Sequence, residues 1–497
     1  MTGTAEKSTI KAVSLFSGLG GLDVGLHQAG IETVVCVEKD ETAARTLKIN
    51  STEHDTRPGQ EHITVQKEYP WTVVDEDIRN TDAEDILEAG GISREEVDLV
   101  VGGPPCQTFS RSNEGSRSGT AAAKGKLYEE FAKILHQIKP AAFLFENVRG
   151  LKSSNGGNDL EVILDALEGD TYTADFQIFN AANYGVPQTR KRVFIVGTRQ
   201  DQTPTFPDPT HTETGEGDTK QWITAGEALK AFDIDASVED TGGYQNAIGS
   251  KYGPLLKDIP AGANYQHFSE RKYDPDREEY VERDESELGE KRFDWRSRHW
   301  NYLLKMDQDR PSWTIQADPG TTVGPFHWRA RKLSLLEQMQ LMDLPLDYYI
   351  AGTPSEVQKQ IGNAVPPGLA AAVGSELVTS LGLIPSPHSN SNRRQESGEK
   401  ISEEQVPFTI EITTETSPWS HANRILHAVH AEEAAVIKAR QQAIPYAIDA
   451  FKIAQTQTDL ELDIAIDEKI IDDQEGHEVS KLVAEIMTKK AAVKAIA

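Results

Sequence analysis

The first part of the chain alternates between short apolar runs and segments with helical spacing. A helix-like stretch, Leu22–Ala29, follows the first of these runs. This alternation predicts an α/β fold, a doubly wound parallel sheet with helices on both faces. Ligands of such sheets bind at the carboxyl ends of the strands. The apolar runs that predict strands are Lys11–Phe16, Thr33–Val37, Val97–Val101, Ala142–Phe145 and Val193–Val196.

The alternation stops at the end of a first domain, which we place at residues 1–198. Residues 199–328 are rich in Pro, Gly, Thr, Asp and Glu and have weak periodicity, so we predict a smaller, loop-rich second domain there. Helical spacing returns at Leu333–Met342 and Pro366–Leu383. We therefore expect residues 329–384 to complete the first domain.

The C-terminal part has a different composition. Residues 385–406 are polar, as is typical of a linker. Ser420–Ala443 and Glu478–Ala497 have Ala, Ile, Leu and Val at helical spacing. We therefore predict that residues 407–497 form a helical C-terminal extension. It could be an accessory cap on the first domain or a module for self-association.

Charge changes the expectation about partners. The chain has 79 Asp and Glu against 51 Lys and Arg, a formal net charge of −28. Nucleic-acid-binding proteins usually carry basic surfaces. Acidity spread along the chain is one adaptation to a high-salt cytoplasm, because it favours solubility. We hypothesise a halophilic source; the alternative is an ordinary acidic protein with local basic clusters.

Cysteine usage and hydropathy favour a cytoplasmic protein. The two cysteines, Cys36 and Cys106, cannot form a disulfide framework and have no metal-ligand spacing. The first residues contain no apolar segment of the signal-peptide type, and no stretch of 18 uncharged apolar residues occurs. We therefore expect neither a membrane span nor a signal peptide.

A glycine- and proline-rich loop carries the second cysteine. Gly102–Ser110 reads GGPPCQTFS and follows a predicted strand. The two prolines before Cys106 fix the backbone and prevent a helix, so the thiol is held on a stiff turn. A free cysteine is often a buried, inert residue. Glycine, proline and cysteine together at a strand end instead favour a reactive thiol.

Nine short motifs follow one another along the chain. They are Phe16–Gly21, Glu38, Asp77-Ile78, the proline–cysteine loop, Leu127-Tyr128, Glu146-Asn147-Val148, Gln188–Arg192, Arg331–Ser334 with Glu337, and Gln360–Pro366. With these motifs in this order, the chain resembles the DNA (cytosine-5) methyltransferase family over about residues 11–198 and 299–383. The number and order of the motifs make the resemblance specific. It implies a Rossmann-like, S-adenosylmethionine-dependent methyltransferase with a target-recognition domain at residues 199–328.

The glycine turn supports a cofactor site for S-adenosylmethionine. A dinucleotide fingerprint needs a third glycine where Asp23 stands, which argues against a nicotinamide oxidoreductase. Gly18 and Gly20 let the backbone approach a cofactor closely. Glu38 ends the next strand, where a carboxylate can accept hydrogen bonds from ribose hydroxyls; alone, it could equally be a solvated carboxylate. The resemblance implies further cofactor contacts from Phe16, Asp77, Ile78, Pro105, Leu127 and Asn363.

The resemblance also implies the catalytic residues. The Cys106 thiolate would attack carbon 6 of cytosine, and Glu146 would donate a proton to ring nitrogen 3. Glu146 follows an apolar run, so burial should raise its pKa; it could also simply pair with a lysine or arginine. Arg192, together with Arg190, would hold cytosine oxygen 2. Either arginine could instead bind phosphate or lie on the surface.

The implied substrate is double-stranded DNA with the target cytosine swung out of the stack. Two other readings remain open: an RNA cytosine methyltransferase of the same fold, and a non-catalytic nucleic-acid-binding protein. A cognate restriction endonuclease is a candidate partner. Candidate DNA contacts in the second domain are Arg292, Arg296, Arg298 and His299, near Trp295 and Trp300.

Overall fold

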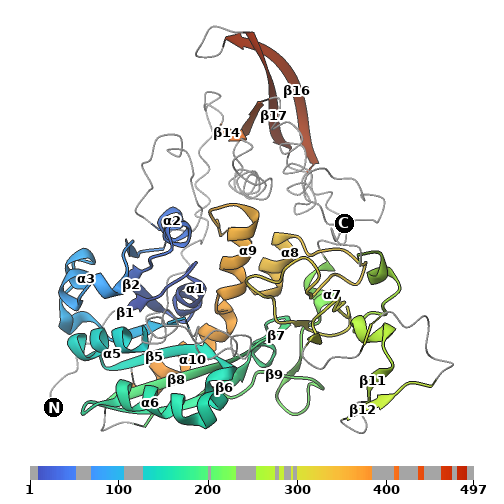
Figure 1. Ribbon diagram of the computed structural model, residues 1–497. Coiled ribbons are helices and arrows are strands. Elements are labelled where there is room, and N and C mark those ends of the chain that lie inside the picture. Colours follow the sequence, from blue (N-terminus) through green and yellow to red (C-terminus); the bar gives the residue numbers. More distant parts are fainter. Residues whose placement is uncertain are drawn as a thin grey trace, which may run out of the picture.

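The structure of the chain is a computed structural model (Figure 1). In this figure the main sheet lies on the left and the small elements α7, β9, β11 and β12 lie on the right. The structure describes residues 9–51, 69–105, 127–199, 203–230, 253–274, 279–284, 293–294, 299–346, 348–382, 408–412, 435–440, 461–472 and 478–489. Cys106, the predicted linker and residues 420–434 lie outside these residues.

A seven-stranded sheet forms the centre of the molecule, in the order β3-β2-β1-β4-β5-β8-β6. All five predicted strands are present in it, and β3 and β6 are strands that the pattern did not predict. Five strands, β3, β2, β1, β4 and β5, run parallel to one another. Their bounds are β1 Ile10–Leu15, β2 Ile31–Val37, β3 Thr72–Val74, β4 Leu99–Gly102, β5 Ala142–Val148, β6 Tyr172–Asn180 and β8 Lys191–Arg199.

The prediction of a wholly parallel sheet was wrong at one edge. Strand β8 runs antiparallel to both β5 and β6, so the sheet is mixed. The reason is the short connection between β6 and β8, residues 181–190, which contains only a 3-10 helix and the two-residue strand β7, Gln188–Thr189. A parallel pair needs a crossover of a dozen or more residues, usually with an α-helix.

Helices cover both faces of the sheet, as the alternation predicted. Along β5, Ala142 and Leu144 pack into the core shared with α1 and α10. Phe143 and Phe145 point to the opposite core, shared with α3, α5 and α6. The helices are α1 Gly21–Gln28, α2 Glu41–Ile49, α3 Ala83–Ala89, α5 Leu127–Ile138, α6 Asn158–Glu168, α8 Leu335–Leu341, α9 Pro354–Asn363 and α10 Pro367–Ser380.

The segment between β8 and α8 consists of short elements. Its described part has a small core of its own, in which Leu255, Tyr265, Leu303 and Phe326 are buried. The elements there are β9 His211–Thr212, β10 Lys220–Gln221, α7 Ala225–Ala228, β11 Arg271–Asp274, β12 Glu279–Glu282 and β13 Ser312–Trp313, with 3-10 helices at Gly253–Lys257 and Tyr265–Phe268. Further 3-10 helices occur at Ile78–Asn80, Arg94–Glu96, Arg149–Gly157 and Ala181–Tyr184.

The predicted helical C-terminal extension was wrong for the described residues. They form a four-stranded sheet in the order β14-β15-β17-β16. Isoleucines alternate with other residues in part of this region, as at Ile464 and Ile466, and a β-branched residue at every second position favours a strand over a helix. The strands are β14 Phe408–Ile412, β15 Ala435–Arg440, β16 Glu461–Asp472 and β17 Glu478–Lys489.

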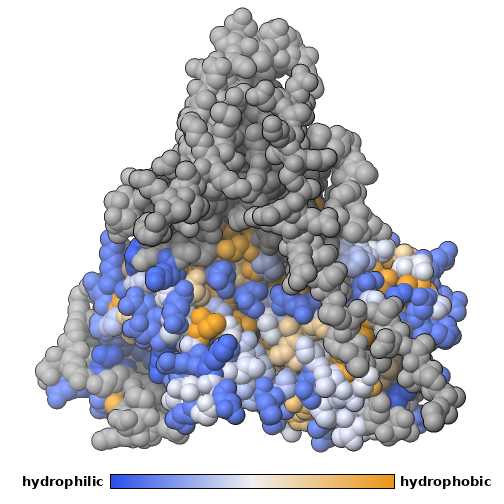
Figure 2. Space-filling model, turned by 180° about the vertical axis from the view of Figure 1, so that it is seen from behind, coloured by the Kyte–Doolittle hydropathy of each residue, from blue (hydrophilic) through white to orange (hydrophobic). Residues whose placement is uncertain are grey.

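Hydrophilic residues dominate the described surface. On the face shown in Figure 2, the hydrophobic residues appear as small, separate groups among hydrophilic ones. Within the part of the chain that the structure describes, every helix is too short or too polar to cross a bilayer.

Candidate active site

Glu146 and Arg192 form an ion pair between the neighbouring strands β5 and β8. Nε of Arg192 lies 3.0 Å from Oε1 of Glu146. Arg192 stands opposite Val148 in the β5–β8 ladder, so Glu146 is its diagonal neighbour, within reach of a long side chain. Glu146 is 9% exposed. The strand continues beyond the predicted run, because Glu146 lies inside β5 and not after it.

Burial raises the pKa of Glu146 above its usual value, and the guanidinium groups of Arg192 and Arg190 oppose this rise. A raised pKa extends the pH range in which the carboxyl group keeps its proton. Glu146 does pair with a cation, Arg192, as the alternative interpretation expected. The pKa of its carboxyl group is nevertheless raised.

The proline loop starts beside this carboxyl group. A Cβ atom on Gly103 would lie only 2.9 Å from Oε2 of Glu146, so the glycine leaves the space that the carboxyl group needs. The side-chain amide of Asn147 donates a hydrogen bond of 3.1 Å to the carbonyl of Pro104. The loop is therefore attached to β5 two residues before Cys106. The side chain of Cys106 itself lies outside the described residues.

The guanidinium group of Arg190 is buried and bonded to backbone carbonyls, which contradicts its predicted contact with a base. The residue is completely buried. Its Nη2 donates to the carbonyls of Gly362 at 2.7 Å and Ala364 at 2.9 Å, and its Nη1 donates to Ile315 at 3.1 Å. A guanidinium with these three acceptors is not available to a substrate. Its position in the motif does not distinguish it from Arg192. The structure does, because Arg190 precedes β8 and donates to backbone carbonyls, whereas Arg192 lies in β8 and pairs with Glu146.

Glu38 holds the glycine turn at the end of β2. Its Oε2 accepts a hydrogen bond of 2.8 Å from the amide of Gly18, and its Oε1 accepts one of 2.7 Å from the amide of Asp40. Burial raises the pKa of Glu38, and the two amides oppose the rise. Phe16 and Gly18 have positive φ angles of 57° and 58°, so the chain turns sharply directly after β1.

The turn also contacts the segment that follows α9. A Cβ atom on Gly21 would lie 2.5 Å from the carbonyl oxygen of Val365, so only glycine permits this approach. The structure therefore brings the glycine turn close to exposed Asn363, which ends α9. These two predicted cofactor segments are more than 300 residues apart in the sequence.

Of the remaining predicted cofactor residues, Phe16, Asp77 and Pro105 follow the strands β1, β3 and β4, and Leu127 begins α5. Phe16, Ile78 and Leu127 belong to one hydrophobic cluster, in which Phe16 is partly exposed. Asp77 accepts hydrogen bonds from the backbone and the side chain of Arg79, and this partner lowers the pKa of its carboxyl group. Pro105 is exposed at the end of the described part of the loop.

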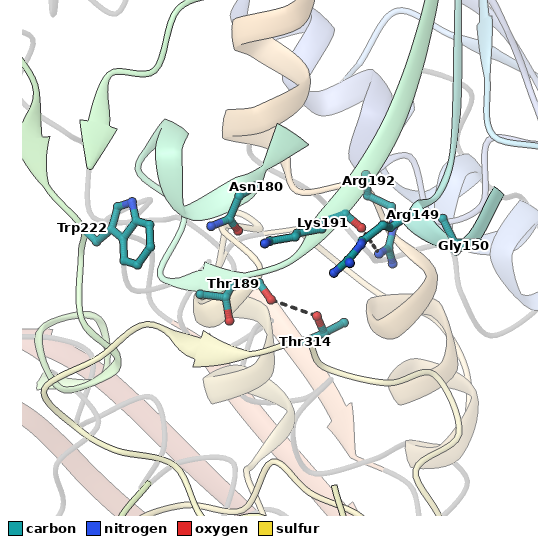
Figure 3. A pocket seen from close by; sticks show the side chains of 9 residues that line it. Arg149, Gly150, Asn180, Thr189, Lys191, Arg192, Trp222 and Thr314 are labelled. Atoms are coloured by element: carbon teal, nitrogen blue, oxygen red, sulfur yellow. Dashed lines mark hydrogen bonds between the residues drawn. The ribbon is translucent and has the colours of Figure 1, made fainter. Parts of the chain in front are cut away.

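An open pocket of about 560 Å³ adjoins the Glu146–Arg192 pair (Figure 3). Val148, Arg149 and Gly150 line it from one chain segment, Thr189, Lys191 and Arg192 from another. Trp222, from the second domain, also lines the pocket, together with Asn180 and Thr314. Sequence reasoning did not single out Arg149 or Trp222, because neither stands in a spacing that marks a site.

Of the four predicted DNA contacts in the second domain, His299 lies among the described residues and is exposed. Its neighbour Trp300 has 45% of its surface accessible. The other three predicted contacts, Arg292, Arg296 and Arg298, and Trp295 near them lie outside the described residues. Among the described side chains, no group of three or more His, Cys, Asp and Glu residues is placed to hold a metal ion.

The family model for C-5 cytosine-specific DNA methylases matches residues 10–379. Among similar proteins, the Type II methyltransferase M.SacI of Streptomyces achromogenes is 33% identical over 402 residues, which are 76% of this chain and 95% of that protein. The Type II methyltransferase M.NgoFVII of Neisseria gonorrhoeae is 32% identical over 72% of this chain and 83% of its own length.

A solved structure supports the fold independently. It is the crystal structure of a protein described as a DNA modification methyltransferase encoded within an E. coli prophage. The TM-score is 0.50 at 20% identity, over 75% of this chain and all of the other. At this identity the similarity applies to the fold alone.

Proposed function

Because this chain belongs to the family of C-5 cytosine-specific DNA methylases, we propose that Cys106, Glu146 and Arg192 form its reaction site. The protein is a DNA (cytosine-5) methyltransferase that uses S-adenosylmethionine. The observation that carries the proposed site is the bond from Asn147 to Pro104, beside the Glu146–Arg192 pair. This bond holds the start of a loop next to a buried carboxyl group, and the loop continues to Cys106.

Cys106 acts as the nucleophile. Cytosine carbon 5 is too weak a nucleophile to accept a methyl group unaided. Addition of the thiolate to carbon 6 makes carbon 5 nucleophilic enough to take the methyl group that S-adenosylmethionine would supply. Loss of the carbon 5 proton and elimination of the thiolate then give 5-methylcytosine and the free cysteine. A free thiol has a pKa of about 8.5, so its surroundings must favour the ionised form at neutral pH.

Glu146 and Arg192 prepare the ring for this attack. Glu146 donates a proton to ring nitrogen 3, which draws electrons from carbon 6. Its raised pKa suits a group that must carry a proton near neutral pH. Arg192 approaches Glu146 through Nε, and its side chain is 13% exposed. Its planar donors suit cytosine oxygen 2, where they would stabilise the charge that develops on the ring.

The glycine turn and its neighbours fit S-adenosylmethionine, which supplies an electrophilic methyl group. A Cβ atom on Gly18 would meet nothing within 4 Å, so the space beside the turn is open. Glu38 has both carboxyl oxygens fixed by backbone amides, and its remaining lone pairs would accept hydrogen bonds from ribose hydroxyls. Phe16, Ile78 and Leu127 would provide apolar contact for the adenine, and Asp77, Pro105 and Asn363 would complete the site.

The target cytosine must leave the duplex, because neither face of a stacked base is open to this chemistry. Base flipping costs a few kcal/mol. The second domain would read the bases around the target, with His299 and Trp300 among its contacts. The two similar proteins named above are Type II methyltransferases, so this protein would recognise a specific short sequence and work beside a cognate restriction endonuclease.

The cellular setting follows from composition. A net charge of −28 fits a cytoplasm with a high salt concentration, in which counterion release adds little to DNA binding. Cys36 is fully buried as a free thiol, which fits a reducing compartment.

Methylome sequencing tests this function. We expect DNA from a methylation-deficient host that expresses the protein to carry 5-methylcytosine in one short sequence. A host that expresses Cys106→Ala should carry no such mark. Methyl transfer into tRNA but not into duplex DNA would contradict the proposal.

A further inference from the structure

The open pocket beside the Glu146–Arg192 pair is in a position to hold part of the substrate. Val148 and Arg192, which face each other in the β5–β8 ladder, both line it. Val148 stands two residues after Glu146. A molecule bound in the pocket would therefore lie next to the reaction site without occupying it.

The charge of this pocket is opposite to that of the chain. Three cationic side chains, Arg149, Lys191 and Arg192, line it, and there is no carboxylate among the described residues of its lining. The chain as a whole has 79 acidic and 51 basic residues. Arg192 is partly neutralised by Glu146, but neither Arg149 nor Lys191 pairs with a carboxylate among the described residues, and both are exposed. This concentration of positive charge favours a polyanion.

The other end of the pocket is aromatic. Figure 3 shows Trp222 across the pocket from Arg149 and Arg192. The indole Nε1 donates a hydrogen bond of 3.0 Å to Oδ1 of Asn183, which fixes the ring. A fixed indole gives a nucleotide a stacking surface that does not depend on sequence.

Combining these features, and resting on the proposed function, we infer that the pocket binds the sugar–phosphate backbone of the strand that carries the target cytosine. Arg149 and Lys191 neutralise the phosphates that flank the target nucleotide, and Trp222 packs against the neighbouring nucleotide. The pocket thus holds the strand in place while the target base is out of the stack.

Salt dependence tests the phosphate contacts. The full-length protein is titrated against a short duplex with its methylated sequence, at several KCl concentrations. Arg149→Met and Lys191→Met should each reduce the slope of log K against log salt by about 0.9. Lys139→Met is the matched control: Lys139 is also exposed, but it precedes β5 at the opposite edge of the sheet, about 20 Å away. Its slope should equal that of the wild type.

A duplex in which one phosphate has been replaced by an uncharged group shows which phosphate the pocket contacts. A methylphosphonate beside the target cytosine should weaken binding by wild type and Lys139→Met roughly tenfold. Lys191→Met should bind the natural duplex about as weakly as the wild type binds the methylphosphonate duplex. Its own affinity should fall little further with the methylphosphonate. Trp222→Leu should weaken binding with an unchanged salt slope, and Trp222→Phe should restore most of it.

Two results separate failure of this inference from failure of the proposed function. If Arg149→Met and Lys191→Met keep the wild-type salt slope and the full methylphosphonate penalty, the pocket does not bind the backbone. Methylation of duplex DNA by the wild type would then leave the proposed function standing. If the wild type neither binds nor methylates duplex DNA, the proposed function and this inference are both refuted.

Discussion

The side-chain amide of Asn147 is hydrogen-bonded to the carbonyl of Pro104 at 3.1 Å. This bond joins the strand that carries Glu146 to the loop that leads to Cys106. Asn147 is 5% exposed, so both partners are shielded from competing water. Asn147 therefore fixes the start of this loop, up to Pro104, relative to the strand of Glu146.

Replacing Asn147 should separate activity from cofactor binding. Asn147→Leu removes the bond and leaves a buried carbonyl unpaired, which costs about 1–3 kcal/mol. We expect the rate constant of methyl transfer in single-turnover experiments to fall at least tenfold, while the Kd for S-adenosylmethionine stays unchanged. An unchanged rate would show that the loop is held by other contacts.

Gly103→Ala should displace the carboxyl group of Glu146, because the new Cβ atom would lie 2.9 Å from Oε2. We expect kcat to fall by about tenfold or more, since positioning of catalytic groups is sensitive to small shifts. Calorimetric titration with S-adenosylhomocysteine should show unchanged cofactor binding. Wild-type turnover in this variant would mean that the carboxyl group has room to move.

The pH profile should report Glu146. Its pKa is raised by burial, and the reaction needs the protonated form, so kcat/KM should decline as pH rises through this raised pKa. Glutamine cannot titrate. Glu146→Gln should therefore show a lower rate without this alkaline decline. An identical decline in wild type and variant would assign the titration to another group.

Glu38 should control cofactor affinity. Glu38→Ala removes the acceptor for the amides of Gly18 and Asp40 as well as the predicted ribose contact. Hydrogen bonds to a charged group contribute about 1.5–3 kcal/mol, so the Kd for S-adenosylmethionine should rise roughly 10- to 100-fold. Glu38→Gln should have an intermediate value. Glu88→Ala, at an exposed position of α3, should bind like the wild type.

Arg190 should contribute to stability. Arg190→Met leaves the carbonyls of Ile315, Gly362 and Ala364 without their buried donor, and we expect a loss of at least about 3 kcal/mol in the free energy of unfolding by urea. Arg94→Met, at an exposed position, should change it by less than about 0.5 kcal/mol. Equal midpoints for the two variants would contradict the structural assignment of Arg190.

The sequence predicted the central strands because they are buried on both faces and read as continuous apolar runs, as in β5. It did not predict β6, an edge strand whose apolar residues alternate with polar ones. It predicted β8 as a strand but not its antiparallel direction, because the direction of a strand depends on the length of the preceding connection. In the C-terminal region, alanine-rich spacing suggested helices where sheet pairing forms instead.

For the site, motif order identified Glu38 and Glu146, which the structure places directly after β2 and inside β5, each with defined partners. It could not separate Arg190 from Arg192, since both stand in one short motif. Their partners distinguish them, and these come together only on folding: backbone carbonyls of residues 315, 362 and 364 for Arg190, and the carboxyl group of Glu146 for Arg192. Nor could it identify Trp222, which joins the pocket only through folding of the second domain.

The most direct test of the account is covalent trapping on duplex DNA that contains 5-fluorocytosine in the methylated sequence. Fluorine at carbon 5 cannot leave as a proton, so the thioether to carbon 6 should persist. With S-adenosylmethionine present, we expect the wild type and Cys36→Ala to form a denaturation-resistant adduct that maps to Cys106. Cys106→Ala should form none. An adduct in Cys106→Ala, or none in the wild type, would contradict catalysis by this thiol.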